Sequence, residues 1–290
     1  MSKEIRSVLI TIVFLIFIYL LSFLGTGIDI EIKTFNAFNY LLGLSVVIQI
    51  LFFIPSFLFK TEKLYDLIGS STYLIVISYA YFSIDDKTVT DTLLFIFVTT
   101  WAVRLGTYLF TRINRDKEDV RFEKAKKNFF WFLQYWIGQA LWVSITSCAA
   151  VIAILKNENN SLNIFLILGS IVWIGGFTFE VLADLQKNKF KKNQDTNSKF
   201  ISTGLWSKSR HPNYFGEISL WIGIYIISIP SFTGLEYLSL ISPIFVYILL
   251  TRMSGINMLE KIADQRYGDS REYQEYKKNT PILIPYKLKK

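Results

Sequence analysis

The chain has 290 residues, of which 52% are hydrophobic and 17% aromatic, and it carries a net charge of +8 with one histidine and one cysteine. A single cysteine excludes an intrachain disulfide and a cysteine-cluster metal site, and a single histidine argues against a histidine-ligated metal centre. Repeated long apolar runs are typical of a membrane protein and not of a soluble domain of this length.

Eight largely uncharged runs are long enough, or nearly so, to cross a bilayer as helices. In chain order they cover residues 5–24, 38–59, 66–84, 89–110, 129–155, 161–182, 214–230 and 235–252. The first run is too long for the apolar core of a signal peptide and no clear cleavage site follows it, so we expect it in the mature chain. The seventh is short and ends at Pro230, as a tilted or half-inserted helix would. The prediction is an all-α, polytopic membrane helix bundle with about eight transmembrane helices.

The distribution of charge predicts the orientation of these helices. With the N-terminus in the cytoplasm and eight crossings, the cytoplasmic segments carry 27 of the 31 lysines and arginines, and the outer loops carry three. This pattern follows the positive-inside rule, so we expect both termini in the cytoplasm, with any polar active site facing it. Topology and lipid headgroups account for the basic charge, so membrane lipids and not nucleic acid are the expected partners.

The most unusual polar cluster is the segment 209–217, which reads SRHPNYFGE. Pro212 directly after polar residues indicates a helix start. Such a helix opens with free backbone N–H groups and the positive end of its dipole, and Arg210 stands just before it. His211 or Glu217 alone could serve as a helix cap. Together the residues predict an anion-binding site at a membrane surface.

Other polar residues leave two interpretations open. Arg104 lies inside a predicted span, where it either snorkels to the surface or faces a polar cavity. Glu180 and Asp184 share a helix face at spacing i,i+4, and Lys187 follows. They form either a solvated helix end or a cavity mouth that holds cofactor hydroxyl or amide groups. The tyrosines and arginines of the tail, residues 253–290, suit an interfacial belt or a fold over a nucleotide.

Several of these motifs together resemble the DUF1295 family, within the steroid 5-alpha-reductase and isoprenylcysteine methyltransferase superfamily of membrane enzymes. The residues that carry the resemblance are Arg210 to Glu217, Leu259-Glu260, Arg266-Tyr267-Gly268, Tyr273, Tyr276 and Ile284-Pro285, and upstream Asp66 to Gly69, Trp101, Arg104-Leu105, Arg112, Glu118-Asp119 and Arg121. The resemblance runs from about residue 60 to the end, and its C-terminal part is the more specific.

The resemblance implies a single membrane domain over residues 1–290, with N-terminal helices in 1–110 and a cofactor-binding region in 111–290 that opens to the cytosol. In the reductase branch the cofactor is NADPH, and a lipophilic substrate enters from the bilayer. The residues implied at the cofactor are Asp184, Lys187, Arg210, His211 and Asn213, with Arg112, Arg121 and Tyr267 as looser candidates. Tyr214 and Glu217 are the expected catalytic residues, and Arg104 and Glu180 are expected to line the substrate cavity.

The function expected from these observations is NADPH-dependent reduction of a carbonyl-activated C=C bond in a steroid-, enoyl- or isoprenoid-like substrate. The steroid reductases share a Gln-Glu-Leu-Pro-Ser stretch, but its nearest match here, residues 52–56, has no acid, which argues against a 3-oxosteroid. The motif that begins at Arg210 also resembles that of membrane methyltransferases. An S-adenosylmethionine-dependent methyltransferase of a lipid or prenylated substrate is therefore the alternative. A non-enzymatic lipid-binding or transport protein is the second alternative. Low cysteine content and the preference for lysine over arginine favour a bacterial plasma membrane.

Overall fold

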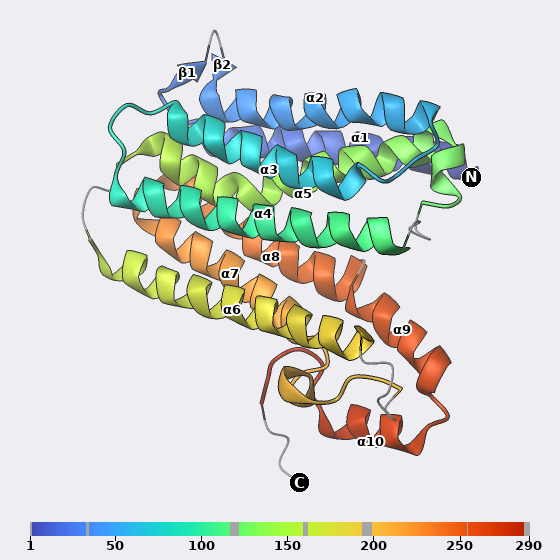
Figure 1. The fold of residues 1–290 in the computed structure, drawn as a ribbon. Coiled ribbons are helices and arrows are strands. Elements are labelled where there is room, and N and C mark those ends of the chain that lie inside the picture. The colour runs from blue at the N-terminus through green and yellow to red at the C-terminus, as the bar shows by residue number, and fades with distance from the viewer. Residues whose placement is uncertain are drawn as a thin grey trace. The chain divides into compact units, whose positions relative to one another are not determined.

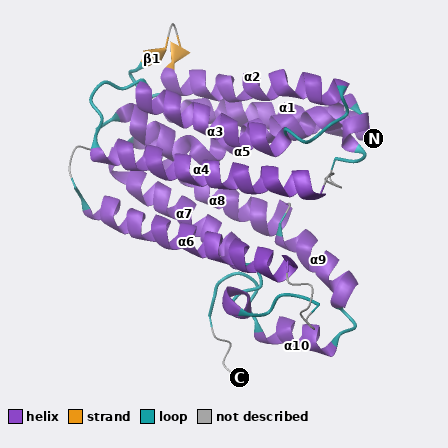
Figure 2. Ribbon diagram, viewed as in Figure 1, coloured by secondary structure: helices purple, strands orange, loops and turns teal. Residues whose placement is uncertain are grey.

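The computed structural model describes residues 2–32, 35–116, 122–158, 162–192, 199–253 and 255–286, and this part of the chain is almost entirely helical (Figures 1 and 2). Its α-helices are α1 (Lys3–Leu21), α2 (Ala37–Leu58), α3 (Tyr65–Phe82), α4 (Val89–Asp116), α5 (Phe129–Lys156), α6 (Ile164–Lys192), α7 (Pro212–Ser228), α8 (Ile241–Ile248), α9 (Ile256–Tyr267) and α10 (Arg271–Asn279). Two short antiparallel strands, β1 (Glu31–Ile32) and β2 (Phe35–Asn36), precede α2.

Seven helical segments of the described residues are long and apolar enough to cross a membrane, which indicates an integral membrane protein. They are Lys3–Gly25, Ala37–Leu58, Val89–Thr111, Phe129–Lys156, Ile164–Lys192, Pro212–Ser231 and Gly234–Tyr267. Seven of the eight predicted spans therefore coincide with such a helix. The eighth, 66–84, forms α3, which is not among the seven because serine, threonine, tyrosine and glycine make up much of it.

Two compact units make up the chain, and each is described by itself. Unit 1 comprises residues 1–166 and 225–242, and unit 2 comprises residues 167–224 and 243–290. In unit 1, α5 contacts α1, α2, α3 and α4, and 89% of its most apolar stretch is buried. A helix that is surrounded by other helices in this way is apolar on all sides. The predicted division of the chain at residue 110 concerns function and stays a prediction.

Short polar side chains begin several helices of unit 1. Asn128 starts α5 by accepting a hydrogen bond from the backbone N–H of Trp131 at 3.0 Å, and Asn36 caps α2 in the same way. At its other end, α5 is tied to the helical turn Gly234–Leu240. Lys156 Nζ donates to Glu236 Oε2 at 2.8 Å, and both side chains are almost fully buried. This ion pair holds the segment 225–242 within unit 1.

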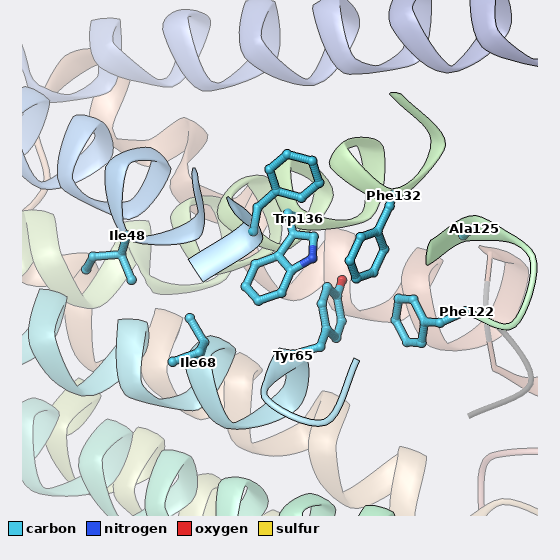
Figure 3. Close-up of a cluster of buried hydrophobic side chains, with 8 residues drawn as sticks. Ile48, Tyr65, Ile68, Phe122, Ala125, Phe132 and Trp136 are labelled. Atoms are coloured by element: carbon cyan, nitrogen blue, oxygen red, sulfur yellow. The ribbon is translucent and has the colours of Figure 1, made fainter. Parts of the chain in front are cut away.

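An aromatic cluster fills one end of unit 1 (Figure 3). The ring of Tyr65 lies edge-on to Trp136 at 5.4 Å and contacts Phe122 at 4.8 Å. The hydroxyl of Tyr65 donates to the backbone carbonyl of Tyr135 at 3.0 Å, so its polar end is satisfied in an apolar setting. The cluster joins α2, α3 and α5 to the segment that precedes α5.

Unit 2 is built on a close pair of helices, α6 and α7, which lie side by side in Figure 1. A Cβ atom added at Gly216 of α7 would lie 2.5 Å from the backbone nitrogen of Glu180 and 2.6 Å from the carbonyl oxygen of Gly176. One at Gly223 would lie 2.7 Å from the carbonyl oxygen of Gly169. Only glycine permits this backbone approach, and it sets the C-terminal half of α6 against the start of α7.

Candidate functional site

The start of α7 is the centre of the polar structure in unit 2. As predicted, Pro212 is the first residue of the helix. Just before it, the Ser209 hydroxyl donates to the carbonyl of Leu283 at 2.7 Å and accepts from the backbone N–H of His211 at 3.2 Å. The backbone N–H of Arg210 donates to the carbonyl of Pro281 at 2.9 Å. The C-terminal segment 281–283 is thereby fixed beside the helix start.

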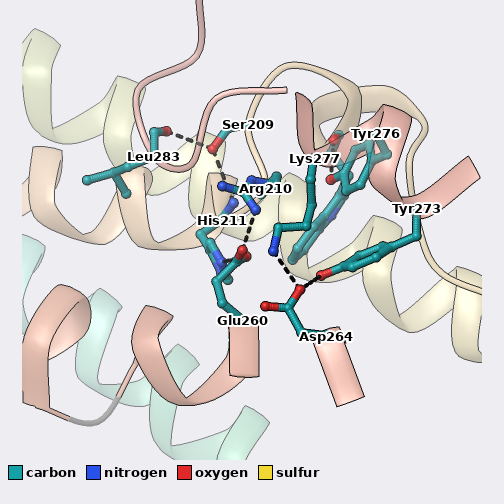
Figure 4. Close-up of polar contacts among 10 residues, drawn as sticks. Ser209, Arg210, His211, Glu260, Asp264, Tyr273, Tyr276, Lys277 and Leu283 are labelled. Carbon is teal, nitrogen blue, oxygen red and sulfur yellow. Dashed lines mark hydrogen bonds and ion pairs between the residues drawn. The ribbon is translucent and has the colours of Figure 1, made fainter. Parts of the chain in front are cut away.

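One carboxylate from α9 holds both basic residues of the motif (Figure 4). Glu260 Oε2 accepts a hydrogen bond from Arg210 Nη1, and Glu260 Oε1 lies 2.8 Å from His211 Nε2. The sequence predicted Arg210 and His211 as site residues but not Glu260, which lies about fifty positions away. No spacing rule separates Glu260 from the several other acids of the tail.

His211 is buried, with only 6% of its surface exposed. Burial lowers the pKa of the imidazole, and the positive charges of Lys187 and Arg210 act in the same direction, while Glu260 opposes them. The neutral ring can still donate its Nε2–H to Glu260. The rings of His211 and Tyr214 are nearly parallel, with centroids 5.7 Å apart.

A second polar group lies between α6 and α7. The three carboxylates Glu180, Asp184 and Glu217 are 2%, 6% and 8% exposed, so this end of α6 is not a solvated surface. Asn213 Nδ2 donates to Asp184 Oδ1 at 3.2 Å, which brings two of the predicted site residues together. Since buried carboxylates require compensating hydrogen bonds or charges, their retention here is typical of a binding site.

The polypeptide before the motif is fastened to α6 by Trp206. Its indole N–H donates to the carbonyl of Ala183 at 3.0 Å, and Lys187 Nζ lies 5.1 Å from the ring centroid. The hydroxyl of Tyr276 donates to the carbonyl of Trp206 at 2.7 Å. Burial raises the pKa of Tyr276, which keeps this phenol protonated as a donor. The loop, α6 and α10 therefore form one framework around the start of α7.

The predicted residue Tyr267 belongs to an aromatic cluster of unit 2. Its ring contacts Phe200 and Tyr273 at centroid distances of 5.8 Å in each case. Phe200 also contacts Tyr273 at 5.2 Å and Tyr276 at 5.4 Å. The tyrosine-rich tail thus folds over the loop that precedes the motif, and Phe200, which the sequence did not single out, is its centre.

An open cavity of about 670 Å³ adjoins the motif. The charged side chains that line it are Arg210, Glu260, Lys261, Asp264 and Lys277. Figure 4 shows Lys277 and Tyr273 turned toward Asp264, whose Oδ1 accepts a hydrogen bond from each. Three cations against two carboxylates leave a net positive lining, which suits an anionic ligand that also carries hydroxyl groups.

The remaining predicted residues lie elsewhere or outside the described part. Arg104 is on α4 in unit 1, half-buried, with its guanidinium 5.6 Å from the ring centroid of Tyr108. Glu180 belongs to unit 2, so a cavity shared by Arg104 and Glu180 stays a prediction. Arg112 falls within α4, but its side chain, like the whole of Arg121, lies outside the described residues.

Comparison with known families gives one match. A family model described as "Protein of unknown function (DUF1295)" covers residues 52–280, from α2 to the end of α10. The chain belongs to the DUF1295 family. No curated protein and no solved structure matches it. The match confirms the family resemblance seen in the motifs and includes every residue predicted at the site.

Proposed function

We propose that this DUF1295 protein is an NADPH-dependent reductase of a carbonyl-activated C=C bond in a lipophilic, steroid-, enoyl- or isoprenoid-like substrate. The observation that carries the proposal is the cavity in unit 2, where Arg210, Lys261 and Lys277 meet at the start of α7. NADPH carries several phosphate charges, and clustered guanidinium and ammonium groups recognise phosphate well.

The donor set of this cavity fits such a cofactor. Arg210 uses Nη1 to bind Glu260, while its Nε is buried and has no hydrogen-bond partner within the described residues. An unsatisfied buried donor costs about 1–3 kcal/mol, which a phosphate oxygen would recover. The guanidinium of Arg210 and the two lysines therefore match the charge of the cofactor.

In this proposal the residues of unit 2 that hold the cofactor have two roles. Arg210, Lys261 and Lys277 bind phosphate groups. The amide of Asn213 and the carboxylates of Asp184 and Glu217 form hydrogen bonds with the ribose hydroxyls or the carboxamide. Lys187 and Tyr267 are their neighbours. When bound, NADPH supplies the hydride for the β-carbon of the substrate.

Tyr214 completes the proposed mechanism. Its phenol donates a hydrogen bond to the substrate carbonyl, which stabilises the negative charge that develops on the oxygen during the reduction. A phenol suits this task because it donates a hydrogen bond without adding a charge to the site. The stacked ring of His211 orients Tyr214, and Glu260 in turn holds His211.

A methyltransferase is the second candidate, and one observation favours it. The cavity also contains the carboxylates of Glu260 and Asp264, close to the ring of Tyr273. A sulfonium cation such as that of S-adenosylmethionine prefers carboxylates and aromatic faces. The methyl acceptor would then be a lipid or a prenylated substrate. The net positive lining makes NADPH the preferred ligand.

We also propose the placement of the protein in its membrane. In this arrangement α3 is an eighth crossing, both termini are cytoplasmic, and the cavity of unit 2 opens to the cytoplasm of a bacterial cell. The distribution of lysine and arginine supports this orientation. The substrate enters from the bilayer, and membrane lipids surround the apolar helices.

Titration of NADPH into the purified full chain in detergent tests the function. Arg210→Ala should weaken binding roughly ten- to hundredfold, since a charge-assisted hydrogen bond contributes about 1.5–3 kcal/mol. Lys208→Ala is the matched control, because this substitution removes the same charge two positions away. Lys208 is exposed and does not line the cavity. Its affinity should equal that of the wild type.

A parallel titration with S-adenosylmethionine separates the two candidates. If the wild type binds S-adenosylmethionine and ignores NADPH at millimolar concentration, the reductase proposal is wrong and the methyltransferase takes its place. Equal NADPH affinity in the wild type and in folded Arg210→Ala would remove Arg210 from the site.

A further inference from the structure

Unit 1 contains a small internal cavity between α3, α4 and α5 that no role described above uses. Its volume is about 10 Å³, roughly the space that the centre of one water molecule requires. Asp66, Ser70 and Tyr73 line it from α3, Leu105 and Leu109 from α4, and Gln139 and Trp142 from α5. The cavity thus combines a polar side with an apolar one.

Two glycines make room for the polar side chains. A Cβ atom at Gly69 would lie 2.2 Å from Gln139 Nε2, and one at Gly106 would lie 2.7 Å from the Cβ of Ser70. Any larger residue at either position would displace a polar group from the cavity. The backbone therefore accommodates Gln139 and Ser70 at a point where apolar packing between helices is the simpler solution.

The side-chain oxygen of Gln139 indicates that the cavity holds a ligand. Gln139 is 3% exposed, and its Oε1 accepts no hydrogen bond from any described residue. Leaving such a buried acceptor unsatisfied is unfavourable. Beside it, the Tyr73 hydroxyl donates to the carbonyl of Trp142 at 3.5 Å.

We propose that this cavity binds one water molecule, a neutral oxygen that both donates and accepts hydrogen bonds. The oxygen donates to Gln139 Oε1, which a ketone oxygen cannot do, and the hydroxyl of Ser70 can donate to it or accept from it. The carboxylate of Asp66 in the lining disfavours an anion. This site does not depend on the function proposed for unit 2.

X-ray radiolytic footprinting of the full chain in detergent tests the proposal, because radicals formed from a bound water oxidise side chains that bulk solvent does not reach. Tyr73, which is 3% exposed, should be oxidised severalfold faster than Trp136, a fully buried residue that does not line the cavity. Gln139→Leu should abolish that difference. The matched control is Gln49→Leu, a fully buried glutamine that does not line the cavity, and it should leave the oxidation of Tyr73 unchanged.

Should Gln139→Leu not fold, Ser70→Ala gives the same comparison with a smaller change. Oxidation of Tyr73 no faster than that of Trp136 in the wild type, or an equal loss in both glutamine variants, would overturn the proposal.

Discussion

At the scale of single residues, the site depends on a carboxylate that local sequence does not identify. The motif Arg210-His211 is visible in the sequence because it stands before a helix-starting proline. Glu260 comes from another helix and joins both residues through its two oxygens. Leu259-Glu260 contributes to the family resemblance, but nothing in the local sequence indicates that this carboxylate contacts Arg210 and His211. Tertiary structure alone makes that contact, so sequence reasoning assigned the basic half of the cluster to the site and not the acidic half.

The environment of His211 leads to a prediction about its pKa. Burial, Lys187 and Arg210 all lower the pKa of the imidazole and only Glu260 raises it, so the folded value should lie below the ordinary 6.5. Since the chain has one histidine, its ¹⁵N-imidazole NMR signal needs no assignment. Titration of this signal in the folded protein measures the pKa directly. A value at or above 6.5 would contradict the prediction.

The same shift predicts how stability depends on pH. Below about pH 6.5 the unfolded chain binds a proton at this histidine that the folded chain does not, so the free energy of unfolding should fall as pH falls through that window. Above it the effect disappears. Melting temperatures of the wild type and His211→Gln between pH 5 and 8 test this, because the dependence due to His211 should be missing from the variant.

At the scale of elements, glycines in α6 and α7 bring the buried carboxylates together. The spacing of Glu180 and Asp184 correctly places both on one face of a helix. What that face contacts could not be predicted, because the glycines at 169, 176, 216 and 223 acquire meaning only when two helices are matched against each other. Their contact buries Glu180 and Glu217 and sets Asn213 beside Asp184.

Alanine at Gly216 should therefore destabilise unit 2. The added Cβ would meet the backbone of Glu180 and Gly176, which can yield only if the helices separate, and such overpacking typically costs about 1–3 kcal/mol. Gly175→Ala is the control on the same helix pair, since nothing lies within 4 Å of its added Cβ and alanine favours the helix. Thermal unfolding in detergent should show a lower melting temperature for the first variant only. Equal melting temperatures would show that the close approach is not needed.

At the scale of the whole molecule, hydropathy predicted the helices more accurately than their grouping into two units. Long apolar runs specify helices by themselves because the backbone must satisfy its hydrogen bonds internally within a bilayer. The assignment of 225–242 to unit 1 depends instead on contacts such as that between Lys156 and Glu236. The sequence offers an isolated lysine and an isolated glutamate for this contact, with nothing to pair them. The predicted span that is not among the seven apolar segments, α3, decides the topology.

A count of eight crossings places both termini on one side, whereas seven would place them on opposite sides. Single cysteines at Ser2, Asp86 and Lys278, all exposed positions, can be tested with an impermeant maleimide on intact cells. The native Cys148 is fully buried and should remain unlabelled. With α3 as a crossing, only the cysteine at Asp86 should react from outside, and the other two should react after permeabilisation.

If α3 does not cross, Asp86 moves to the cytoplasmic side and Lys278 to the outside, so both results reverse. That reversal would also place the start of α9 and the proposed cofactor cavity on the outer face, where no cytoplasmic NADPH reaches them, and would remove the reductase proposal together with the topology.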